Sequence, residues 1–367
     1  MSYLPEGHVN VTSWVVEQPG SAMVWRSREE QPAPGEVLIE TAACGVCHTD
    51  LGFFYDGVPT KHPFPLTLGH EISGRVVEAG AGAEPWLGAA AVVPAVLPCG
   101  ECGACRAGRG QICPAQIFPG NDVHGGFGTH VRVPARGLCR VPDLLNTELN
   151  PGGLDLTALS VIADAVSTPY QAAIRADVQP GDLAVWVGVG GVGGFGVQIC
   201  AALGATVVAI DVNDDRLTEL SAHGAAVGFN STRIETKVIR KAIRALCEER
   251  GIPSWRMRIF EASGHPAGQS LAFGLLGHGA TLSVVGYTAK TVEIRLSNLM
   301  AFDAVAMGNW GCLPEHYPAV VALALSGRVD LEPFITRRPM SEINEVFDEL
   351  HHGKTRGRIV LIPEAHA

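Results

Sequence analysis

The chain has 367 residues, more than a single hydrophobic core usually accommodates, so two domains are expected. It carries 27 basic and 37 acidic residues, for a formal net charge of −10. This balance argues against nucleic acid or an anionic membrane surface as the main partner. The 44 glycines indicate many tight turns or close approaches of backbone to a ligand.

Two segments are candidates for a targeting or membrane segment, and neither indicates a membrane or secreted protein. The first residues, MSYLPEGHVNVTSW, lack the basic start and apolar core of a secretory signal, so a cytoplasmic location and reduced cysteines are expected. Residues 183–210 contain no charged side chain and are long enough to span a bilayer. Their many glycines would weaken one continuous helix and favour a strand, a turn and a helix start instead.

Short β-branched runs separated by Gly and Pro, such as 36–40 and 72–78, predict a mostly β region up to about residue 160. From about residue 165 apolar strands alternate with helical segments, which predicts a doubly wound parallel sheet. The strands are expected at 184–189, 206–211, 258–261 and 280–286, and the helices at 192–203 and 215–223. Helices at 314–326 and 341–352 and a strand at 357–362 are then expected to return to the first domain. The sequence thus predicts an α/β protein, with a β-rich domain of residues 1–163 and 313–367 and a nucleotide-binding domain of residues 164–312.

A glycine-rich turn follows the first strand of the expected parallel sheet. It comprises Gly188, Gly190, Gly191, Val192 and Gly193, and Asp211 ends the next strand. Glycines let the backbone approach a pyrophosphate at a helix N-terminus, while the acid accepts hydrogen bonds from ribose hydroxyls. A carboxylate there would repel a 2′-phosphate, so NAD is favoured over NADP. Arg216 is either a contact to the ribose edge or a solvated helix residue.

Four cysteines lie within 15 residues and are separated by glycines: Cys99, Cys102, Cys105 and Cys113. Four thiolates at this spacing are typical of a closed, tetrahedral structural zinc. A zinc-ribbon module for nucleic acid is disfavoured by the net charge, and an iron–sulfur cluster is the remaining chemical alternative. A second, more diffuse pair, Cys47 and His70, would need a third ligand from elsewhere to form a catalytic zinc site with one open position.

The motifs CGVCHTD at 44–50, GHE at 69–71, the four-cysteine loop and GVGGVG at 188–193 occur in the order seen in zinc-dependent medium-chain alcohol dehydrogenases, which this chain resembles over nearly its whole length. The resemblance implies a GroES-like catalytic domain and a Rossmann domain that binds NAD, with two zinc ions per chain. It also implies the following roles: Cys47 and His70 as ligands of the catalytic zinc, Glu71 as a nearby acid, Asp50 as the partner that orients His70, His48 and Arg358 at the cofactor pyrophosphate, and Thr49 as the hydroxyl that takes the substrate proton.

Two positions depart from the family pattern. The usual third zinc ligand is a cysteine six residues before a tyrosine, and here Asp164 precedes Tyr170, which implies a site with one oxygen, one sulfur and one nitrogen ligand. Alternatively, Asp164 caps the following helix and Glu71 binds the metal. The histidine that often passes the proton to solvent is replaced by Gly52, so water, another histidine or a different path would be needed.

The expected activity is oxidation of a secondary alcohol or reduction of the matching ketone. The resemblance implies a small-molecule substrate, specifically a cyclic hydroxyacyl-CoA thioester, and a homodimer or homotetramer. A general alcohol or polyol dehydrogenase is the main alternative, and a zinc-free quinone or enoyl reductase and a non-enzymatic nucleotide sensor are minor ones. The segment GFFYDG at 52–57 is either a wall of the ring pocket or ordinary core.

Overall fold

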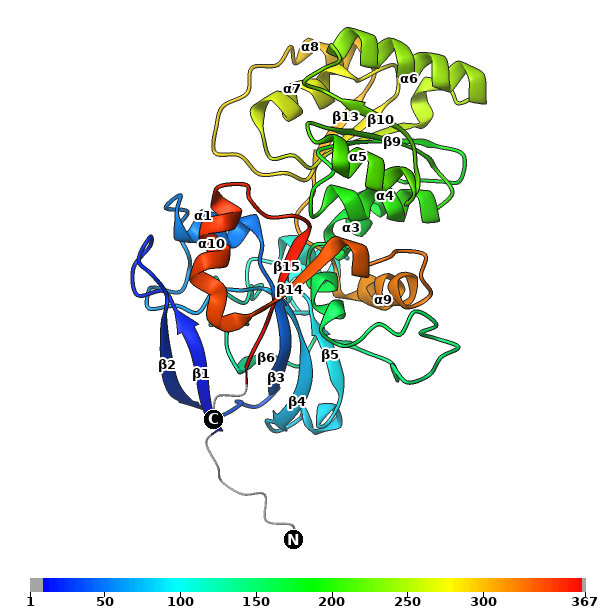
Figure 1. Ribbon diagram of the computed structural model, residues 1–367. Coiled ribbons are helices and arrows are strands. Elements are labelled where there is room, and N and C mark those ends of the chain that lie inside the picture. The colour runs from blue at the N-terminus through cyan, green and yellow to red at the C-terminus, as the bar shows by residue number, and fades with distance from the viewer. Residues whose placement is uncertain (1–8, 365–367) are drawn as a thin grey trace. The chain divides into compact units, whose positions relative to one another are not determined.

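The structure, a computed structural model, describes residues 9–364 and divides into two compact units (Figure 1). Within the described range, the first unit contains residues 9–164, 311–326 and 331–364. The second contains residues 165–310 together with 327–330, a short segment that the sequence analysis assigned to the first domain. No helix among the described residues is long and apolar enough to cross a membrane.

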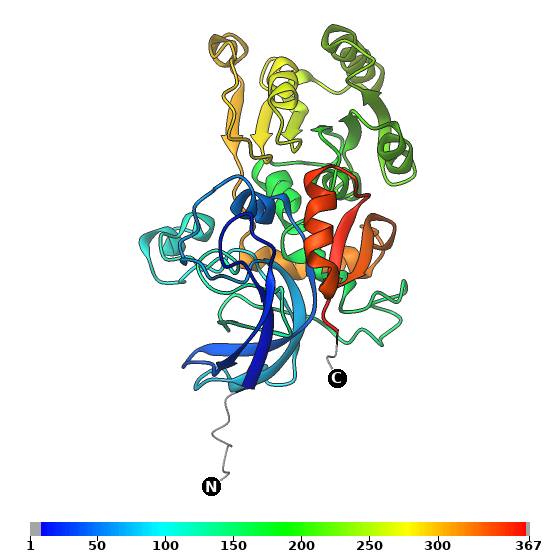
Figure 2. The same cartoon turned by 60° about the vertical axis from the view of Figure 1, so that its left-hand side comes forward.

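The first unit is built mainly from antiparallel strands. Strands β1 (Val9–Val15) and β2 (Val24–Glu30) pair as a hairpin, drawn in dark blue in Figure 2. The main sheet has seven strands in the order β14-β15-β3-β4-β5-β7, with β6 paired to β3. These strands are β3 (Glu36–Gly45), β4 (Glu71–Ala79), β5 (Ala90–Val93), β6 (His130–Pro134), β7 (Cys139–Arg140), β14 (Ile335–Pro339) and β15 (Arg358–Ile362).

The helices of the first unit are short and lie between these strands. They are α1 (His48–Phe54), α2 (Gly103–Arg106), α9 (Tyr317–Leu325) and α10 (Ile343–His351), with the 3-10 turn η3 (Ala158–Ala163). Strand β15 pairs antiparallel with β3 and parallel with β14, so the last described strand completes the sheet that begins near residue 36. This brings Arg358, at the start of β15, into the same sheet as the end of β3, which leads to Cys47.

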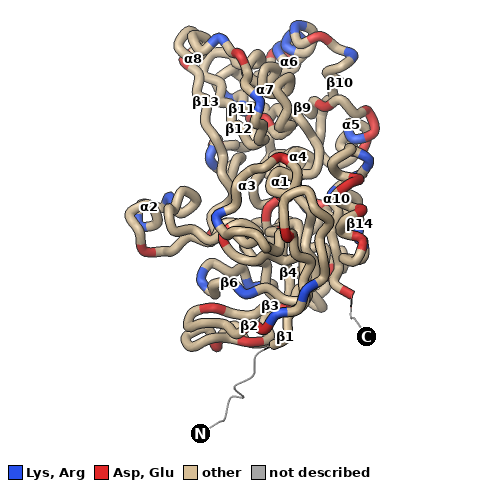
Figure 3. Tube along the Cα trace, turned by 90° about the vertical axis from the view of Figure 1, so that its left-hand side faces the viewer, with Lys and Arg blue, Asp and Glu red and all other residues tan. Residues whose placement is uncertain are grey.

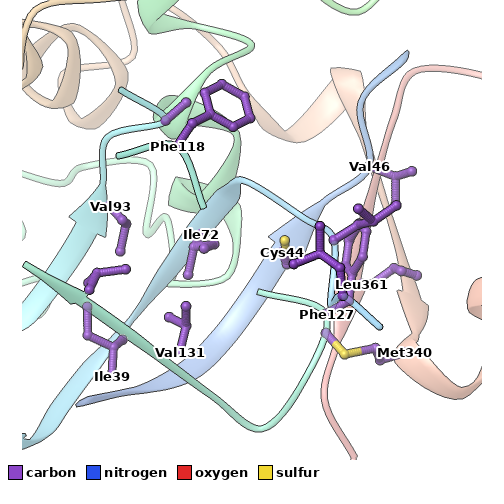
Figure 4. Packing of buried hydrophobic residues seen from close by; sticks show 14 of the residues in the cluster. Ile39, Cys44, Val46, Ile72, Val93, Phe118, Phe127, Val131, Met340 and Leu361 are labelled. Atoms are coloured by element: carbon purple, nitrogen blue, oxygen red, sulfur yellow. The ribbon is translucent and has the colours of Figure 1, made fainter. Parts of the chain in front are cut away.

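One apolar cluster fills the first unit. Ile39 of β3 and Ile72 of β4 pack near Val131 of β6, while Phe127 and Leu361 lie beside Cys44 (Figure 4). Phe53 and Phe54 belong to the same buried cluster, and the Phe54 ring packs edge-on against Phe347 of α10. The structure therefore resolves the alternatives for the 52–57 segment in favour of core packing for its two phenylalanines.

The second unit has the parallel sheet that the sequence predicts, in the order β10-β9-β8-β11-β12-β13. The strands are β8 (Leu183–Val187), β9 (Thr206–Asp211), β10 (Ala225–Asn230), β11 (Met257–Glu261), β12 (Thr281–Val284) and β13 (Val305–Gly308). The helices are α3 (Ser167–Arg175), α4 (Gly193–Ala202), α5 (Asp214–Ser221), α6 (Thr236–Arg250), α7 (Pro266–Gly274) and α8 (Ser297–Phe302). Charged residues of both signs lie along α5 and α6 (Figure 3), whereas β8 is buried throughout, as expected for a strand covered on both faces. The predicted fold class, a GroES-like domain with a Rossmann domain, is confirmed.

Candidate active site and metal centres

Cys47, His70 and Asp164 come together at one site in the first unit. Cys47 is the residue before α1, His70 immediately precedes β4, and Asp164 follows η3. The Asp164 Oδ2 atom lies 3.6 Å from His70 Nε2 and 3.7 Å from Cys47 Sγ. Zinc bonds of 2.0–2.3 Å at tetrahedral angles require about 3.4 Å between nitrogen and oxygen ligands and about 3.6 Å between sulfur and oxygen ligands. The three donor atoms therefore have the spacing of a tetrahedral zinc site.

The Nε2 atom of His70 gives a second indication that this site holds a metal. It is buried and has no hydrogen-bond partner among the described residues. A buried polar atom without a partner is costly unless a ligand or ion satisfies it. The donor set of one thiolate, one imidazole and one carboxylate is one that zinc accepts, and it supplies two negative charges when His70 is neutral.

Asp50 holds the two loops of the site in place. Its carboxylate accepts hydrogen bonds from the backbone N–H of Cys47, at 2.9 Å, and from that of Gly69, at 3.1 Å. It also lies 3.3 Å from His70 Nδ1, so Nδ1–H donates to Asp50 and the lone pair of Nε2 faces the site. Burial lowers the pKa of His70, but Asp50, Asp164 and Cys47 together raise it more, to well above its usual value.

Glu71 is paired with Arg358 inside the same unit. The Arg358 Nε–H donates to Glu71 Oε2 at 3.0 Å, and Nη2 donates to Oε1, so the contact is bidentate. Both side chains are buried. Burial raises the pKa of the Glu71 carboxyl above its usual value, and Arg358 opposes that rise. Because the two residues are 287 positions apart, the sequence analysis missed the pair; a buried acid next to a metal-binding histidine was the only available signal.

Asp164 is not the N-cap residue of the helix that follows it. Helix α3 begins at Ser167 with Val166 as its N-cap residue, so Asp164 is two residues too early. A carboxylate oxygen of Glu71 also lies within 4.8 Å of the donor atoms of the other three residues. However, both oxygens of Glu71 accept hydrogen bonds from Arg358, whereas Asp164 faces the donor atoms of Cys47 and His70. The geometry favours Asp164 over Glu71 as the third ligand.

His48 and Thr49, on the first turn of α1, are the exposed residues beside this site. The Thr49 hydroxyl oxygen lies 3.7 Å from Cys47 Sγ, so it stands next to the metal-ligand cluster. Gly52, one turn later in α1, is buried. Arg358, expected to contact a cofactor pyrophosphate, is buried against Glu71 instead of being exposed to ligand.

The four-cysteine loop forms a second cluster in the first unit. Its Sγ atoms are separated by 3.5–3.8 Å in four pairs, and four thiolates around a zinc ion at 2.3 Å would lie about 3.8 Å apart. The backbone N–H groups of Glu101 and Cys102 lower the pKa of the Cys99 thiol to about 6, whereas burial and the neighbouring cysteines raise that of Cys105 to about 12. A thiol with a lowered pKa is more readily ionised, which favours metal binding. Four close thiol groups with no fifth position fit a closed structural site.

The glycine-rich turn lies in the second unit, between β8 and α4. Gly188 has φ +82°, and a Cβ atom there would come within 2.4 Å of the Ser263 backbone, so only glycine fits. Asp211, at the end of β9, accepts a hydrogen bond from Val189 N–H at 2.8 Å and thereby holds the turn. Its other oxygen lies 3.7 Å from Arg216 Nη1, so the structure places Arg216 beside the predicted ribose-binding carboxylate. Gly190, Gly191 and Val192 form the turn itself, and Gly193 begins α4.

Comparisons with known proteins agree with this description. Residues 33–143 match the alcohol dehydrogenase GroES-like domain, and residues 191–326 match the zinc-binding dehydrogenase domain. An alcohol dehydrogenase of Geobacillus stearothermophilus is 31% identical over 340 residues, covering 89% of this chain and 91% of that protein. The alcohol dehydrogenase of Aeropyrum pernix has a TM-score of 0.82 at 27% identity, covering 96% of this chain and 100% of that one. The alcohol dehydrogenase of Thermotoga maritima has a TM-score of 0.85 at 25% identity, covering 97% of this chain and 100% of that one.

The chain therefore belongs to the zinc-dependent medium-chain alcohol dehydrogenase family, and the predicted family resemblance is confirmed. As a member of this family, the protein is an oxidoreductase that acts on alcohols.

Proposed function

We propose that the protein oxidises a secondary alcohol to a ketone with NAD and one catalytic zinc, and that it catalyses the reverse reduction. The observation that carries the proposal is the spacing of three atoms, Cys47 Sγ, His70 Nε2 and Asp164 Oδ2, which matches that of zinc ligands. His70 Nε2 is buried and has no hydrogen-bond partner among the described residues. A zinc ion held there would act as a Lewis acid on the alcohol and lower the pKa of its hydroxyl group. The cofactor would supply the hydride acceptor.

The chain's own residues position the reactants and move the proton. Thr49, exposed beside Cys47, is the group that takes the hydroxyl proton of the alcohol. Asp50 keeps the His70 ring in one tautomer and orientation. His48 is the residue on the same helical turn that would face the cofactor pyrophosphate. Because Gly52 has no side chain to relay a proton, the proton leaves Thr49 through water or through His48.

Arg358 has a role in this proposal that differs from direct pyrophosphate binding. Its bidentate contact keeps the Glu71 carboxylate away from the position of the third ligand and balances its charge. Glu71 then remains close enough to approach the metal when ligands exchange, as the resemblance to the family implies. Arg358 therefore acts on the metal site through Glu71, as a positioning residue.

For the cofactor, NAD is proposed over NADP because Asp211 ends β9 with a buried carboxylate at the edge of the sheet where a ribose would lie. Arg216 stands 3.7 Å from that carboxylate and is the one feature that would favour a 2′-phosphate. The ratio of kcat/KM for NAD to kcat/KM for NADP measures whether Asp211 or Arg216 determines the cofactor preference. We expect NAD to be preferred by at least about tenfold, since a carboxylate and a phosphate repel at close range.

For the substrate, we propose 6-hydroxycyclohex-1-ene-1-carbonyl-CoA, oxidised to the 6-oxo compound in anaerobic degradation of benzoyl-CoA. The support is the resemblance of the whole sequence to that dehydrogenase. The alternative is a general alcohol or polyol dehydrogenase, which the same metal site would serve equally well. Two phenylalanines that could have formed a ring pocket, Phe53 and Phe54, are buried in the core and give no support to either substrate.

The decisive experiment is NAD-dependent turnover of a panel that contains free secondary alcohols, polyols and cyclic hydroxyacyl-CoA thioesters. We expect the thioester to have the highest kcat/KM. Faster turnover of a free alcohol or polyol would replace the proposed substrate but leave the reaction type intact. No turnover of any alcohol, with a cofactor still bound, would favour a nucleotide sensor, and activity without zinc would favour a zinc-free reductase.

Two further properties belong to this proposal. We expect about two zinc ions per chain by metal analysis, one at Cys47, His70 and Asp164 and one at the four cysteines. We also expect a homodimer or homotetramer, which light scattering coupled to size-exclusion chromatography measures directly. A monomer would contradict the expected oligomeric state but would not affect the expected zinc content.

A further inference from the structure

A pocket of about 390 Å³ lies in the first unit and shares no lining residue with either cluster of metal-binding residues. One side is formed by the β1–β2 hairpin, with Val15, Arg26 and Arg28, and the other side by two loops that carry His62, Phe64 and His124. Small-molecule sites commonly have volumes of roughly 300–1,000 Å³ and combine apolar walls with a few polar groups. The pocket matches both features, and neither the metal centres nor the glycine-rich turn uses any of these residues.

Two arginines, each paired with a glutamate, lie on one wall of the pocket. Arg26 and Arg28 are two residues apart on β2, so their side chains point to the same face of the strand. Arg26 is paired with Glu17, which also lines the pocket. Arg28 is only 22% exposed; its Nε donates to Glu30 at 2.7 Å and its Nη1 donates to Ser13 at 2.6 Å. Within residues 9–364, Nη2 of Arg28 donates no hydrogen bond, so one charged donor is available to a ligand.

The hydrogen bonds of the two histidines determine where their protons lie. The Nδ1 atom of His124 accepts a hydrogen bond from the backbone N–H of Thr67 at 3.1 Å, so the proton of the neutral ring is on Nε2. His62 Nδ1 is 2.6 Å from the carbonyl oxygen of Pro63, to which it must donate. The two rings lie 5.0 Å apart. His124 therefore offers an N–H donor through Nε2, and this tautomer disfavours a metal ion, which would need a lone pair at that atom.

The electrostatic surroundings of His124 agree with an anion site. Burial, together with the positive charges of Arg28, His62 and Arg132, lowers the pKa of His124 to about 4, although Glu30 acts in the opposite direction. The ring is therefore neutral at pH 7, and the potential around it is positive. Both arginines are already paired, Arg26 with Glu17 and Arg28 with Glu30, so the wall can accommodate an anion of one charge better than a phosphate dianion.

We propose that this pocket binds a small monocarboxylate with an apolar body. The carboxylate accepts hydrogen bonds from Arg28 Nη2 and from His124 Nε2–H, and the apolar body lies against Val15, Phe64 and the neighbouring prolines. Such a site is a second ligand site of the enzyme and does not depend on which alcohol the metal centre oxidises.

Isothermal titration calorimetry of the full zinc-loaded chain with benzoate tests this proposal, with benzamide as the neutral compound of the same shape. We expect saturable benzoate binding with Kd on the order of 1 mM and benzamide binding at least about tenfold weaker, because a hydrogen bond to a charged partner is the stronger kind. Inorganic phosphate should bind more weakly than benzoate. Equal binding of benzoate and benzamide, or none by either, would overturn the proposal.

Variants distinguish this pocket from benzoate binding at the metal centre. Arg28→Gln and His124→Asn should each weaken benzoate binding by about tenfold. The asparagine side-chain oxygen can still accept from Thr67 N–H, so the loop is kept while the Nε2 donor is removed. Arg132→Gln is the matched control: Arg132 shares the partner Glu30 with Arg28 but does not line the pocket, so its loss should change Kd by less than about threefold.

Circular dichroism and zinc content establish that each variant is folded before it is titrated. Should Arg28→Gln fail to fold, His124→Asn alone decides the outcome. If benzoate binds Arg28→Gln and His124→Asn as tightly as it binds the parent protein, it binds elsewhere, for example at the metal centre. That result would contradict the proposal.

Discussion

The resemblance to the family implies a cysteine ligand at the position of Asp164. The carboxylate oxygen of Asp164 lies 3.7 Å from Cys47 Sγ and 3.6 Å from His70 Nε2, the spacing expected between two ligand atoms of one zinc ion. An oxygen ligand is harder than sulfur and donates less charge to zinc, while the total charge of the ligand set is the same. The exchange therefore changes the softness of the site without changing its charge.

Replacing this residue should separate the two metal sites. We expect Asp164→Ala to lower the zinc content from about two ions to about one per chain and to reduce kcat by at least about a hundredfold, because a catalytic zinc needs three protein ligands. Atomic absorption and steady-state kinetics measure both effects. Asp164→Cys is the control and should retain both zinc ions. Unchanged zinc content and activity in Asp164→Ala would exclude Asp164 as a ligand.

His124 should make the stability of the protein depend on pH. The pKa of the folded state is about 4 because of burial, whereas an unfolded histidine titrates near 6.5. As the pH falls from about 6.5 towards 4, the unfolded chain gains a proton that the folded chain does not, so stability is lost in that window. At higher pH both states are neutral and the contribution is constant.

His124→Asn removes this titration while it keeps an acceptor for Thr67. Between pH 7 and pH 5 the free energy of unfolding should fall by about 1 kcal/mol more in the parent protein than in the variant, allowing for the partial exposure of the ring. Urea unfolding at the two pH values measures the difference. Equal losses in both proteins would mean that the pKa of His124 is not lowered in the folded state.

Among the elements, α4 shows how tightly a helix can lie on the parallel sheet. A Cβ atom at Gly196 would come within 2.3 Å of the Trp186 ring, which is fully buried and stacks 4.3 Å from Phe260. Trp186 also donates a hydrogen bond to Cys200 of the same helix. Since the ring is held on both sides, it cannot move aside to admit a methyl group.

Gly196→Ala should therefore destabilise the protein by about 2 kcal/mol, even though alanine favours a helix more than glycine does. Gly194, on the same helix, is the matched control, because its Cβ would lie 3.4 Å from the nearest atom. Gly194→Ala should leave stability unchanged or raise it by up to about 1 kcal/mol. The midpoints of chemical unfolding compare the two variants. A Gly196→Ala variant as stable as Gly194→Ala would mean that the sheet and helix can separate without cost.

Four strands and two helices of the second unit, α4 and α5, could be predicted because their signals are local. Strand β9 has the bounds expected from its apolar run, and β8, β11 and β12 differ from the expected bounds by a few residues. The two edge strands, β10 and β13, were not predicted. In the first unit, β3 continues to Gly45, beyond the predicted 36–40 segment, because pairing with β4 and β15 extends it. The other strands of the first unit, β1, β2, β5, β6, β7 and β14, were not predicted individually. Strand β6, for example, is defined by its pairing with the distant strand β3.

The same difference between local and distant signals applies to the site. The four cysteines could be recognised from spacing and residue type, whereas the roles of Cys47 and His70 were implied by the resemblance to the family. The pairing of Glu71 with Arg358 and the pocket at His124 depend on segments that only the folded sheet brings together. Residue type and local spacing cannot reveal such contacts.

At the scale of the whole molecule, the residues proposed to bind zinc and those proposed to bind the nucleotide belong to different units. Cys47, His70, Asp164 and the four-cysteine loop all lie in the first unit, whereas the glycine-rich turn and Asp211 lie in the second. Each unit has its own buried apolar cluster. Binding of the cofactor by the second unit should then be independent of zinc, although catalysis requires both.

Removing zinc with 1,10-phenanthroline tests this independence. We expect turnover to disappear, while the Kd for NADH, measured by its fluorescence, changes by less than about threefold, because the hydrogen bond that holds the turn joins Asp211 to Val189 and includes no metal ligand. Adding zinc back should restore turnover and serves as the control for irreversible unfolding. A loss of NADH affinity of about tenfold or more that parallels zinc release would show that the metal sites support the nucleotide-binding unit, and the two units would then have to be treated as one energetic system.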